Sequence, residues 1–447
     1  MERIVSKFGG TSNSTAEAVQ ASMELAADSQ VVVASAPGVL STEQLADFPV
    51  DTSAPAELLQ KKVTQLLLDA RQYYAETGEL PDNHIEAITA RYRAITGELA
   101  DCALGARWVD TIAPRVHQTI TMGSDYASML GEQLQTEVYE SVGFVLLDPS
   151  RAVQDLGRDY RNWGQWLAEA IEPGQRYIIG GNVSFDGQRM YSFGRGGSDT
   201  TAALVARALG VDACDIYSDT PLRSAHPDIV DPSESFILHN ITYDVGRELG
   251  VNGTGLVHPD ALAIMQGSGI PTRAKNTFGL ADVYTTYHDA QEDEPGQGRP
   301  VAVSLMEQVT LLRVHEPGMR ESQGRIADIS QALANSKINL IDFIGDGADR
   351  DIIIVECDDQ AASAAEIIRQ HLRNGGTVTG QELALLTLAG YRLRDSSLEI
   401  QLRLNNQRAF GETKSPFALV GEHSLRFGID RNNAREVARR VHNLEVK

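Results

Sequence analysis

The stretch Tyr191-Ser-Phe-Gly-Arg-Gly-Gly-Ser-Asp-Thr-Thr-Ala202 decides the fold of this chain. A short apolar run enters the glycine loop Gly194–Asp199, and a helical pattern begins immediately after the loop. A strand, a glycine loop and a helix N-terminus in this order bring bare backbone N–H groups against an anion. Arg195 lies inside the loop and can add a bidentate grip on a carboxylate or a phosphate. The stretch therefore predicts an anion-binding turn in an α/β protein.

A second glycine loop, Lys7-Phe-Gly-Gly-Thr-Ser12, follows the first strand that the sequence predicts, over residues 2–5. Its two glycines let the backbone come close to a ligand, and its lysine supplies a positive charge. Two anion cradles, one with a lysine and one with an arginine, indicate an enzyme that joins two anions.

Apolar runs and helical periodicity alternate on both sides of these loops. Such alternation predicts a mainly parallel sheet with helices on both faces. The ligand crevice of such a sheet lies outside the carboxyl ends of its strands, where both glycine loops fall. Gly210 is the expected C-cap of the helix after the Gly194–Asp199 loop. The expected strands cover 2–5, 31–34, 144–147, 177–180, 190–193 and 215–218, and the expected helices run from Ser12 or Ser14 to about 27, and over about 61–75, 81–115, 122–134 and 200–209.

The composition limits the classes of partner. The chain has 447 residues, enough for two or three domains that each have a core. Its formal net charge of −22 argues against a nucleic acid partner, because a phosphate backbone needs a basic footprint. The three cysteines are far apart and show no metal-ligand spacing, so we expect neither a disulfide framework nor a zinc site. The absence of a signal peptide or a long apolar span predicts a cytoplasmic protein with no membrane partner.

A change in composition divides the chain near residue 290. The segment 287–300 is polar and rich in glycine and proline, which is typical of a linker. We place a first domain over 1–290, the linker over 291–300 and a second region over 301–447. In the second region we expect strands over 309–314, 339–344, 351–357, 383–389, 398–404 and 424–428 and helices over 324–336 and 432–441.

These motifs resemble those of the aspartate kinases. Lys7–Ser12 matches the Lys-Phe-Gly-Gly-Thr-Ser signature of that family, and Gly194–Asp199 matches its second glycine loop. The similarity covers nearly the whole chain and ends in a tail like the family's paired ACT domains. Further matching segments are Ser35–Gly38, Lys62–Leu67, Asp215–Asp219 and Gly253–Pro259.

The resemblance implies a fold, a reaction and a mode of regulation. The fold is the three-layer amino-acid-kinase α/β fold with a mainly parallel sheet, followed by tandem ACT domains of βαββαβ order. The reaction is transfer of the γ-phosphoryl group of ATP to the side-chain carboxylate of L-aspartate, the step that opens the synthesis of lysine, threonine and methionine. Mg²⁺ is expected on the nucleotide phosphates, because no dedicated protein ligand is evident. An amino acid effector, lysine or threonine, and a homodimer or higher homo-oligomer formed through the ACT domains are also implied.

The resemblance also assigns roles to individual residues. The attacking carboxylate is already nucleophilic, so the enzyme needs no general base and must instead hold two anions together. Lys7 would reach the β- and γ-phosphates, and Arg195 would pair with a substrate carboxylate. Asp199 either holds Lys7 or caps the following helix. The other expected contacts are Thr11, Ser12, Thr64, Asp125, Gly196, Gly197 and Ser198 for the substrate, and Gly9, Gly10, Ser218, Asp219, Arg223 and Lys275 for ATP.

Three positions depart from the family pattern. Asp125 stands where the family has a glutamate, so this carboxylate has a shorter reach. Asp228 replaces an arginine near the ATP phosphates, and Gly255 replaces a nucleotide-contacting lysine of many members. Arg223 and Lys275 are nearby cations that could serve instead. Three hypotheses follow: an aspartate kinase with a rearranged ATP loop, a kinase of a related carboxylic amino acid, or a catalytically weak homologue that binds amino acids and regulates a partner.

The ACT resemblance points to an effector site in the second region. Such units bind an amino acid between the loop after their first strand and the start of the next strand. Asp342 either meets the ammonium group of an effector or faces solvent. Met319, Asn339 and Asp342 are the effector contacts we expect, with Glu316, Gly318 and Leu340 beside them.

Overall fold

The computed structural model describes most of the chain outside residues 36–135. The helices expected over 61–75, 81–115 and 122–134 lie outside the described residues, as do the expected site residues Thr11, Thr64, Asp125, Arg195, Asp219, Met319 and Asn339. The described residues are 2–10, 12, 16–35, 136, 143–152, 154–185, 190–193, 196–218, 220–279, 283–318, 324–336, 338, 340–345, 350–355, 358–373, 375–411 and 418–446.

The chain folds into two compact units, and it passes between them more than once. Helix α10 (Tyr243–Val251) contributes its start to the first unit and its end to the second. None of the helices in the described ranges is long and apolar enough to cross a lipid bilayer. The first unit contains Met1–Leu222, Ile237–Arg247 and Leu256–Ala290, and the second contains Arg223–Phe236, Glu248–Gly255 and Gln291–Lys447.

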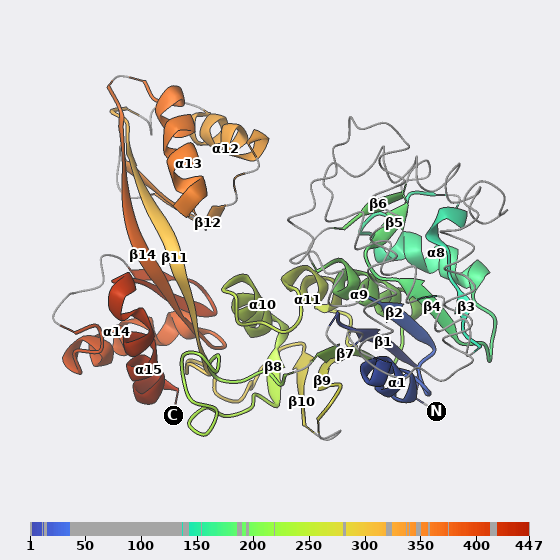
Figure 1. Cartoon of the computed structure of the whole chain (residues 1–447). Coiled ribbons are helices and arrows are strands. Elements are labelled where there is room, and N and C mark those ends of the chain that lie inside the picture. The colour runs from blue at the N-terminus through green and yellow to red at the C-terminus, as the bar shows by residue number, and fades with distance from the viewer. Residues whose placement is uncertain are drawn as a thin grey trace. The chain divides into compact units, whose positions relative to one another are not determined.

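The first unit is built on an eight-stranded sheet (Figure 1). Neighbouring strands are parallel except for the pair β9 and β10, which confirms the predicted mainly parallel sheet. Strand β1 lies between β2 and β7, so the loops after β1 and β7 lie at the same edge of the sheet. Across the sheet the order is β3 (Val145–Leu146), β4 (Tyr177–Gly180), β2 (Val31–Ala34), β1 (Ile4–Phe8), β7 (Ala213–Ser218), β9 (Thr272–Asn276), β10 (Tyr284–His288) and β8 (Asn240–Thr242).

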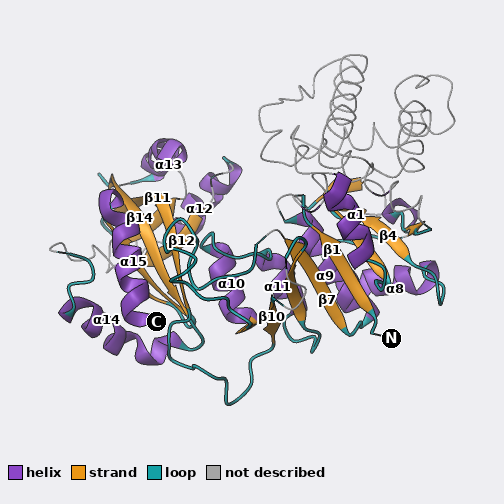
Figure 2. Ribbon diagram, turned by 60° about the horizontal axis from the view of Figure 1, so that its bottom comes forward, coloured by secondary structure: helices purple, strands orange, loops and turns teal. Residues whose placement is uncertain are grey.

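Helices cover both faces of this sheet (Figure 2). Successive side chains of a strand alternate between faces, so Lys7 and Phe8 of β1 point in opposite directions. Phe8 stacks on Tyr217 with ring centroids 4.6 Å apart, and α1 (Ala16–Leu25) adds apolar side chains to that core. Lys7 points to the other face, which α9 (Gly197–Leu209) covers.

Helix α9 begins directly at the second glycine loop. Gly196 precedes it with a φ of 72°, and Gly210 follows it with a φ of 58°, backbone conformations that favour glycine. The predicted C-cap at Gly210 is therefore confirmed. The helix is buried on several sides because α8 (Tyr160–Ala170) and α11 (Pro259–Met265) pack beside it. The smaller elements of this unit are η4 (Pro149–Arg151) and the hairpin of β5 (Val183–Phe185) and β6 (Met190–Ser192).

The second unit contains a six-stranded antiparallel sheet. Two long strands, β11 and β14, lie side by side at its centre. The order is β12 (Leu340–Gly345), β13 (Arg350–Val355), β11 (Ala302–His315), β14 (Thr377–Ala389), β16 (Ser424–Ile429) and β15 (Ala418–Val420). The other elements are α12 (Arg325–Asn335), α13 (Asp358–His371), η6 (Leu393–Ser396), α14 (Ser397–Asn406), η7 (Arg431–Asn433) and α15 (Ala434–Glu445).

Two βαββαβ units share this sheet and are interleaved. The first consists of the end of β11, α12, β12, β13, α13 and the start of β14. The second consists of the end of β14, α14, β15, β16 and α15, and its last strand is the start of β11, where Ala302–Met306 pairs with Leu385–Ala389. A break in register between Met306 and Val309 separates the two halves of β11. Each βαββαβ unit has a hydrophobic core of its own.

One predicted strand is wrong, because residues 398–404 belong to helix α14. The run Leu398-Glu-Ile-Gln-Leu-Arg-Leu404 alternates apolar and polar residues, which is the period of a strand. In the structure Ile400 and Leu404, one helical turn apart, are fully buried, whereas Leu398 is 70% exposed. Helix α13 has no counterpart among the predicted elements.

A row of polar side chains on the second sheet holds the end of α10. Ser304, Thr387 and Arg426 are aligned on the neighbouring strands β11, β14 and β16. Oγ1 of Thr387 donates to Oδ1 of the fully buried Asn252 at 2.9 Å. The hydroxyls of Ser304 and Thr254 are 2.6 Å apart. The segment that follows α10 is therefore part of the second unit's interior.

Candidate active site

Lys7 and Asp199 form an ion pair that links the two glycine loops. The ammonium Nζ of Lys7, near the end of β1, lies 2.7 Å from Oδ1 of Asp199 in the first turn of α9. The side chains are only 12% and 8% exposed. Of the two roles that the sequence left open for Asp199, the structure shows the contact with Lys7, and Gly196 occupies the N-cap position of α9.

The backbone of His258 binds the other oxygen of Asp199. Its N–H donates to Oδ2 at 2.9 Å, so both carboxylate oxygens have a partner. His258 is also the N-cap of α11, where its Nδ1 accepts from the backbone N–H of Asp260 at 3.3 Å. Asp199 is thus fixed between β1, α9 and the start of α11, and it holds the Lys7 ammonium in one position.

Close packing explains the glycines of the second loop. A Cβ at Gly196 would fall 2.2 Å from the ring of His258, and a Cβ at Gly197 would fall 1.9 Å from Oδ1 of Asn182. The Cβ of Ser198 in turn lies 2.4 Å from where a Cβ at Gly181 would be. The loop backbone therefore lies directly against its neighbours. Contacts of Gly196, Gly197 and Ser198 with a substrate stay predictions.

The first glycine loop is fixed to neighbouring strands at two points. The N–H of Gly9 donates to the carbonyl oxygen of Tyr217 at 3.2 Å. Oγ of Ser12 lies 2.6 Å from Oγ1 of Thr277, and both side chains are buried. The N–H of Gly9 is therefore used to hold the loop close to β7 and is not directed at a ligand. Because the Ser12 hydroxyl is engaged by Thr277, a substrate contact at Ser12 would come from its backbone. Gly10 lies between these two anchored positions.

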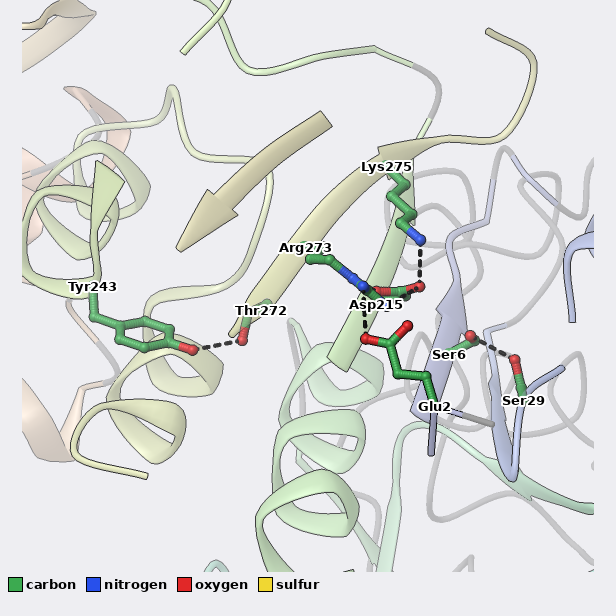
Figure 3. Close-up of polar contacts among 8 residues, drawn as sticks. All are labelled: Glu2, Ser6, Ser29, Asp215, Tyr243, Thr272, Arg273 and Lys275. Carbon is green, nitrogen blue, oxygen red and sulfur yellow. Dashed lines mark hydrogen bonds and ion pairs between the residues drawn. The ribbon is translucent and has the colours of Figure 1, made fainter. Parts of the chain in front are cut away.

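Lys275 lies on the opposite face of the sheet from Lys7. The two lysines are out of step by one residue across β7, and successive side chains of a strand point to opposite faces. Nζ of Lys275 is 2.6 Å from Oδ2 of the buried Asp215, as Figure 3 shows. Arg273 binds the same carboxylate at 2.5 Å and 3.1 Å, and Glu2 accepts from Arg273 at 3.0 Å. The structure does not bring Lys275 and Lys7 together, and a nucleotide contact of Lys275 stays a prediction.

Two hydroxyl pairs in Figure 3 support the same sheet. Ser6 of β1 and Ser29, in the turn before β2, have hydroxyl oxygens 2.7 Å apart in the interior. The hydroxyl of Tyr243 lies 3.0 Å from Oγ1 of Thr272, which attaches the start of α10 to β9. Each pair joins neighbouring segments of the first unit, and none of the four residues belongs to a glycine loop.

The residues expected at the altered ATP loop belong to the second unit. Arg223 donates through Nε to Oγ of Ser235 at 2.8 Å, and through Nη2 to the carbonyl oxygens of Ser235, at 2.6 Å, and of Pro232. The Asp228 side chain is 67% exposed. A Cβ at Gly255 would fall 2.5 Å from a backbone atom of α10. The Arg223 guanidinium is thus engaged by its own loop, and its contact with ATP stays a prediction.

Burial raises the pKa of two groups that the charge of Asp199 also affects, the Tyr287 hydroxyl and the Cys214 thiol. Burial, and then the charge of Asp199, raise the pKa of the Tyr287 hydroxyl above its ordinary value of 10.0. Burial also raises the pKa of the Cys214 thiol above its ordinary value of 9.0, with further contributions from Asp215 and Asp199. Both groups are neutral at pH 7, so neither supplies a thiolate or phenolate nucleophile.

In the second unit, Asp342 is paired with an arginine. Oδ2 of Asp342 lies 2.6 Å from Nη1 of Arg426, whose Nη2 lies 2.8 Å from Glu248 at the end of α10. The Asp342 side chain is 29% exposed, so it faces solvent in part while Arg426 engages its carboxylate. A contact with an effector ammonium stays a prediction.

Glu316 forms a buried ion pair with Arg325. Two hydrogen bonds of 2.9 Å and 2.7 Å join the guanidinium to the carboxylate, and the side chains are 2% and 3% exposed. The backbone N–H of Arg373 donates to the same carboxylate at 3.0 Å. The hydrogen bonds from Arg325 hold the pKa of Glu316 below its ordinary value. Glu316 is thus a structural residue of the first βαββαβ unit.

The described part of the active site offers positive charge and N–H groups. Within the described ranges, no group of three or more His, Cys, Asp and Glu side chains could hold a metal ion. Lys7 supplies an ammonium, and the start of α9 supplies backbone N–H groups and the positive end of the helix dipole. Such an arrangement can hold phosphate and carboxylate groups and stabilise negative charge that builds up between them.

Two contributors to this site, Thr277 and the backbone N–H of His258, have no role among those predicted from the sequence. The contact between Ser12 and Thr277 joins positions 265 residues apart, which periodicity cannot reveal. The sequence does indicate that His258 is a helix N-cap, because the next residue, Pro259, is typical of the first helical position. That signal predicts the cap, but not its contact with Asp199.

The fold and the two joined glycine loops define an amino acid kinase. The model of the amino acid kinase family matches residues 2–276, more than half of the chain, and the chain belongs to this family. The curated relatives include the aspartokinase of Corynebacterium efficiens, which is 26% identical over 226 residues that cover 49% of each chain. The match thus spans about half the length of this relative.

Solved structures share the fold over the whole chain. The structure of Escherichia coli aspartokinase III in complex with aspartate and ADP has a TM-score of 0.68 and 22% identity, and the match covers 99% of both chains. The same enzyme in complex with lysine and aspartate has a TM-score of 0.66 and 22% identity, covering 99% of this chain and 100% of that chain. The fold of both units is therefore the aspartokinase fold, an amino-acid-kinase sheet with ACT regulatory units.

Proposed function

We propose that this protein is an aspartate kinase, which converts L-aspartate and Mg-ATP to 4-phospho-L-aspartate and ADP. The observation that carries the proposal is the Lys7–Asp199 ion pair, which joins the two glycine loops at one edge of a parallel sheet. The similarity to aspartokinases supports the substrate, and the E. coli complex contains both aspartate and ADP.

In the proposed reaction an oxygen of the aspartate carboxylate attacks the γ-phosphorus of ATP. The bond to the β,γ-bridging oxygen breaks, and ADP leaves with its electron pair. Catalysis then depends on positioning and on stabilising the charge on the transferred group. Lys7 provides that stabilisation with an ammonium that Asp199 already holds in place, so little reorganisation is needed. The start of α9 and Arg195 bind the substrate carboxylate.

Mg²⁺ fits this site as a ligand of the nucleotide. The carboxylate of Asp199, which lies at the loops, is occupied by Lys7 and the N–H of His258. Lys7 and the backbone N–H groups at the start of α9 are donors, which suit phosphate oxygens rather than a metal ion. Mg²⁺ on the phosphates neutralises part of their charge, and Lys7 adds to that effect.

The ACT units give the proposed enzyme a regulatory site. An amino acid effector, lysine or threonine, binds at Met319, Asn339 and Asp342 in a cytoplasmic homodimer formed through the ACT units. The E. coli structure with bound lysine supports an effector of this kind. The enzyme would then supply the aspartyl phosphate for lysine and threonine synthesis.

The test is acyl-phosphate formation, trapped with hydroxylamine, from ATP and a series of carboxylic amino acids. We expect product from L-aspartate and its loss in Lys7→Ala. If product forms only from glutamate or another acid, that acid is the acceptor in place of aspartate. A folded protein that forms no product with any acceptor would overturn the proposal.

The weakened nucleotide side favours a second candidate function. Lys7 is in the first unit, whereas Arg223 is in the second and is engaged by Ser235 and Pro232. Lys275 points to the opposite face of the sheet. A catalytically weak homologue that binds an amino acid and regulates a partner therefore stays the alternative. Calorimetric binding of lysine or threonine without turnover would favour it.

A further inference from the structure

Thr277 joins three segments at the carboxyl edge of the first sheet. It follows the last residue of β9 and is 6% exposed. Its backbone N–H donates to the carbonyl oxygen of Ser218, the last residue of β7, at 2.9 Å. Its hydroxyl lies 2.6 Å from the hydroxyl of Ser12, at the far end of the first glycine loop. One residue thus connects the loop after β1 with the ends of β7 and β9.

Ser12 is held from two sides, which leaves its loop little freedom. Its side chain is fully buried against Thr277, and its carbonyl oxygen accepts from Oγ of Ser22 in α1 at 2.8 Å. The other end of the loop is fixed by the N–H of Gly9 on Tyr217. The backbone between Gly9 and Ser12 therefore spans two anchors on β7 and β9, and Thr277 provides the second of them.

We infer that Thr277 is a positioning residue for ATP. Its hydroxyl sets where the first glycine loop lies relative to Ser218, the residue expected at the base and ribose of the nucleotide. This inference rests on the proposed function for the identity of the nucleotide. Lys7, Gly9 and Gly10 of the first glycine loop are expected ATP contacts, whereas Ser12 is an expected substrate contact. A shift of the whole loop should therefore affect ATP more strongly than aspartate.

The chain offers a matched control for this hydroxyl pair. Ser6 and Ser29 form a buried hydroxyl pair of nearly the same length, 2.7 Å, on the same sheet but outside the loops. Thr277→Val and Ser29→Ala each remove one hydroxyl from such a pair. Thr277→Ser keeps the hydroxyl and loses a methyl group. Loss of a buried hydrogen bond lowers the melting temperature in the first two variants, whereas loop positioning is affected in Thr277→Val alone.

The experiment measures the KM for ATP, the KM for aspartate and kcat, together with ATP affinity by titration calorimetry. We expect Thr277→Val to raise the KM and the dissociation constant for ATP about tenfold and to lower kcat, because a displaced loop grips the phosphates poorly. The KM for aspartate should change much less. Thr277→Ser should restore ATP binding, and Ser29→Ala should keep the wild-type constants.

The outcomes separate this inference from the proposed function. If the wild type binds ATP but phosphorylates no acceptor, the proposed function fails, and the calorimetric comparison of Thr277→Val with Ser29→Ala still decides the inference. Wild-type ATP affinity in Thr277→Val would overturn the inference, as would an equal loss in Ser29→Ala. A wild-type protein that binds no ATP would overturn both.

Discussion

The first sheet carries two lysine–aspartate ion pairs that differ in what surrounds the aspartate. Lys7 and Asp199 are 2.7 Å apart on the face covered by α9, and Lys275 and Asp215 are 2.6 Å apart on the opposite face. Asp199 is bound in addition by the N–H of His258, at the start of a helix beside the glycine loops. Asp215 is bound in addition by Arg273, whose charge is shared with a surface glutamate. The distance within each pair does not distinguish them.

The difference lies in what each lysine is fixed for. At the first pair a single cation is held between two loops whose backbones suit anions, so its charge is available to a ligand. At the second pair one buried carboxylate on β7 is shared by two cations of β9, Arg273 and Lys275, which joins the two strands and stabilises the sheet. A lysine on a parallel sheet is therefore judged by its face and by the other partners of its carboxylate.

The largest expected effect is the loss of activity when Lys7 is replaced by methionine, and the same replacement of Lys275 is its control. Lys7→Met should reduce acyl-phosphate formation by about 100- to 1,000-fold, the usual loss on removing one group that stabilises the transition state. Lys275→Met should lower the melting temperature and keep most of the activity, because Asp215 retains Arg273. Steady-state kinetics and thermal unfolding of both variants check this. An equal loss of activity in Lys275→Met would show that Lys275 reaches the nucleotide, as its place in the sequence predicts.

The two aspartates should respond in the opposite way when stability is measured. Asp215→Asn should lower the free energy of unfolding by about 3 kcal/mol, at the lower end for breaking a buried ion pair, because Arg273 and Lys275 keep some access to water. Asp199→Asn keeps an acceptor for the N–H of His258 and should cost mainly kcat, since the Lys7 ammonium loses its partner. Urea unfolding of both variants measures the difference. If the Asp215→Asn variant is as stable as the wild type, the second pair does not have the structural role inferred for it.

The smallest expected effect is on the pH dependence of stability, through the ion pair of Glu316 and Arg325 in the second unit. Hydrogen bonds from Arg325 hold the pKa of Glu316 below the ordinary value of 4.5, so the folded state favours the carboxylate. The pair therefore contributes stability that is complete above about pH 4.5 and is lost as the pH falls through the lower pKa of the folded state. The wild type should lose stability over that range faster than Glu316→Gln, as followed by urea midpoints at a series of pH values. Parallel curves for the two proteins would contradict this.

The sequence predicts the parts of the fold that depend on neighbouring residues. The two glycine loops, the mainly parallel sheet and the cap at Gly210 follow from local patterns, and the structure confirms the sheet and the cap. The face on which Lys275 lies depends on the register between β7 and β9, which a local pattern does not contain. The same holds for the contact between Ser12 and Thr277.

Misleading periodicity explains the failure at α14. Its four leucine and isoleucine residues between 398 and 404 alternate with polar residues, so a strand and a helix compete for the same pattern. The helix prevails because burial of Ile400 and Leu404 on one face satisfies the core of the second βαββαβ unit. Two apolar side chains, Leu398 and Leu402, are left exposed as a result.

The buried contacts of Asn252 and Thr254, just after α10, limit where the gene can be cut or joined to a related one. Asn252 and Thr254 come from within the first 290 residues, yet they complete the interior of the second unit through Thr387 and Ser304. A gene cut after residue 290 would separate Thr387 and Ser304 from these partners and leave buried polar groups unpaired. Exchange of C-terminal regions between related chains should therefore succeed when Glu248–Gly255 is taken from the same donor as the C-terminal region. The second unit of this protein is thus discontinuous in the sequence, and an exchange must respect its separate segments.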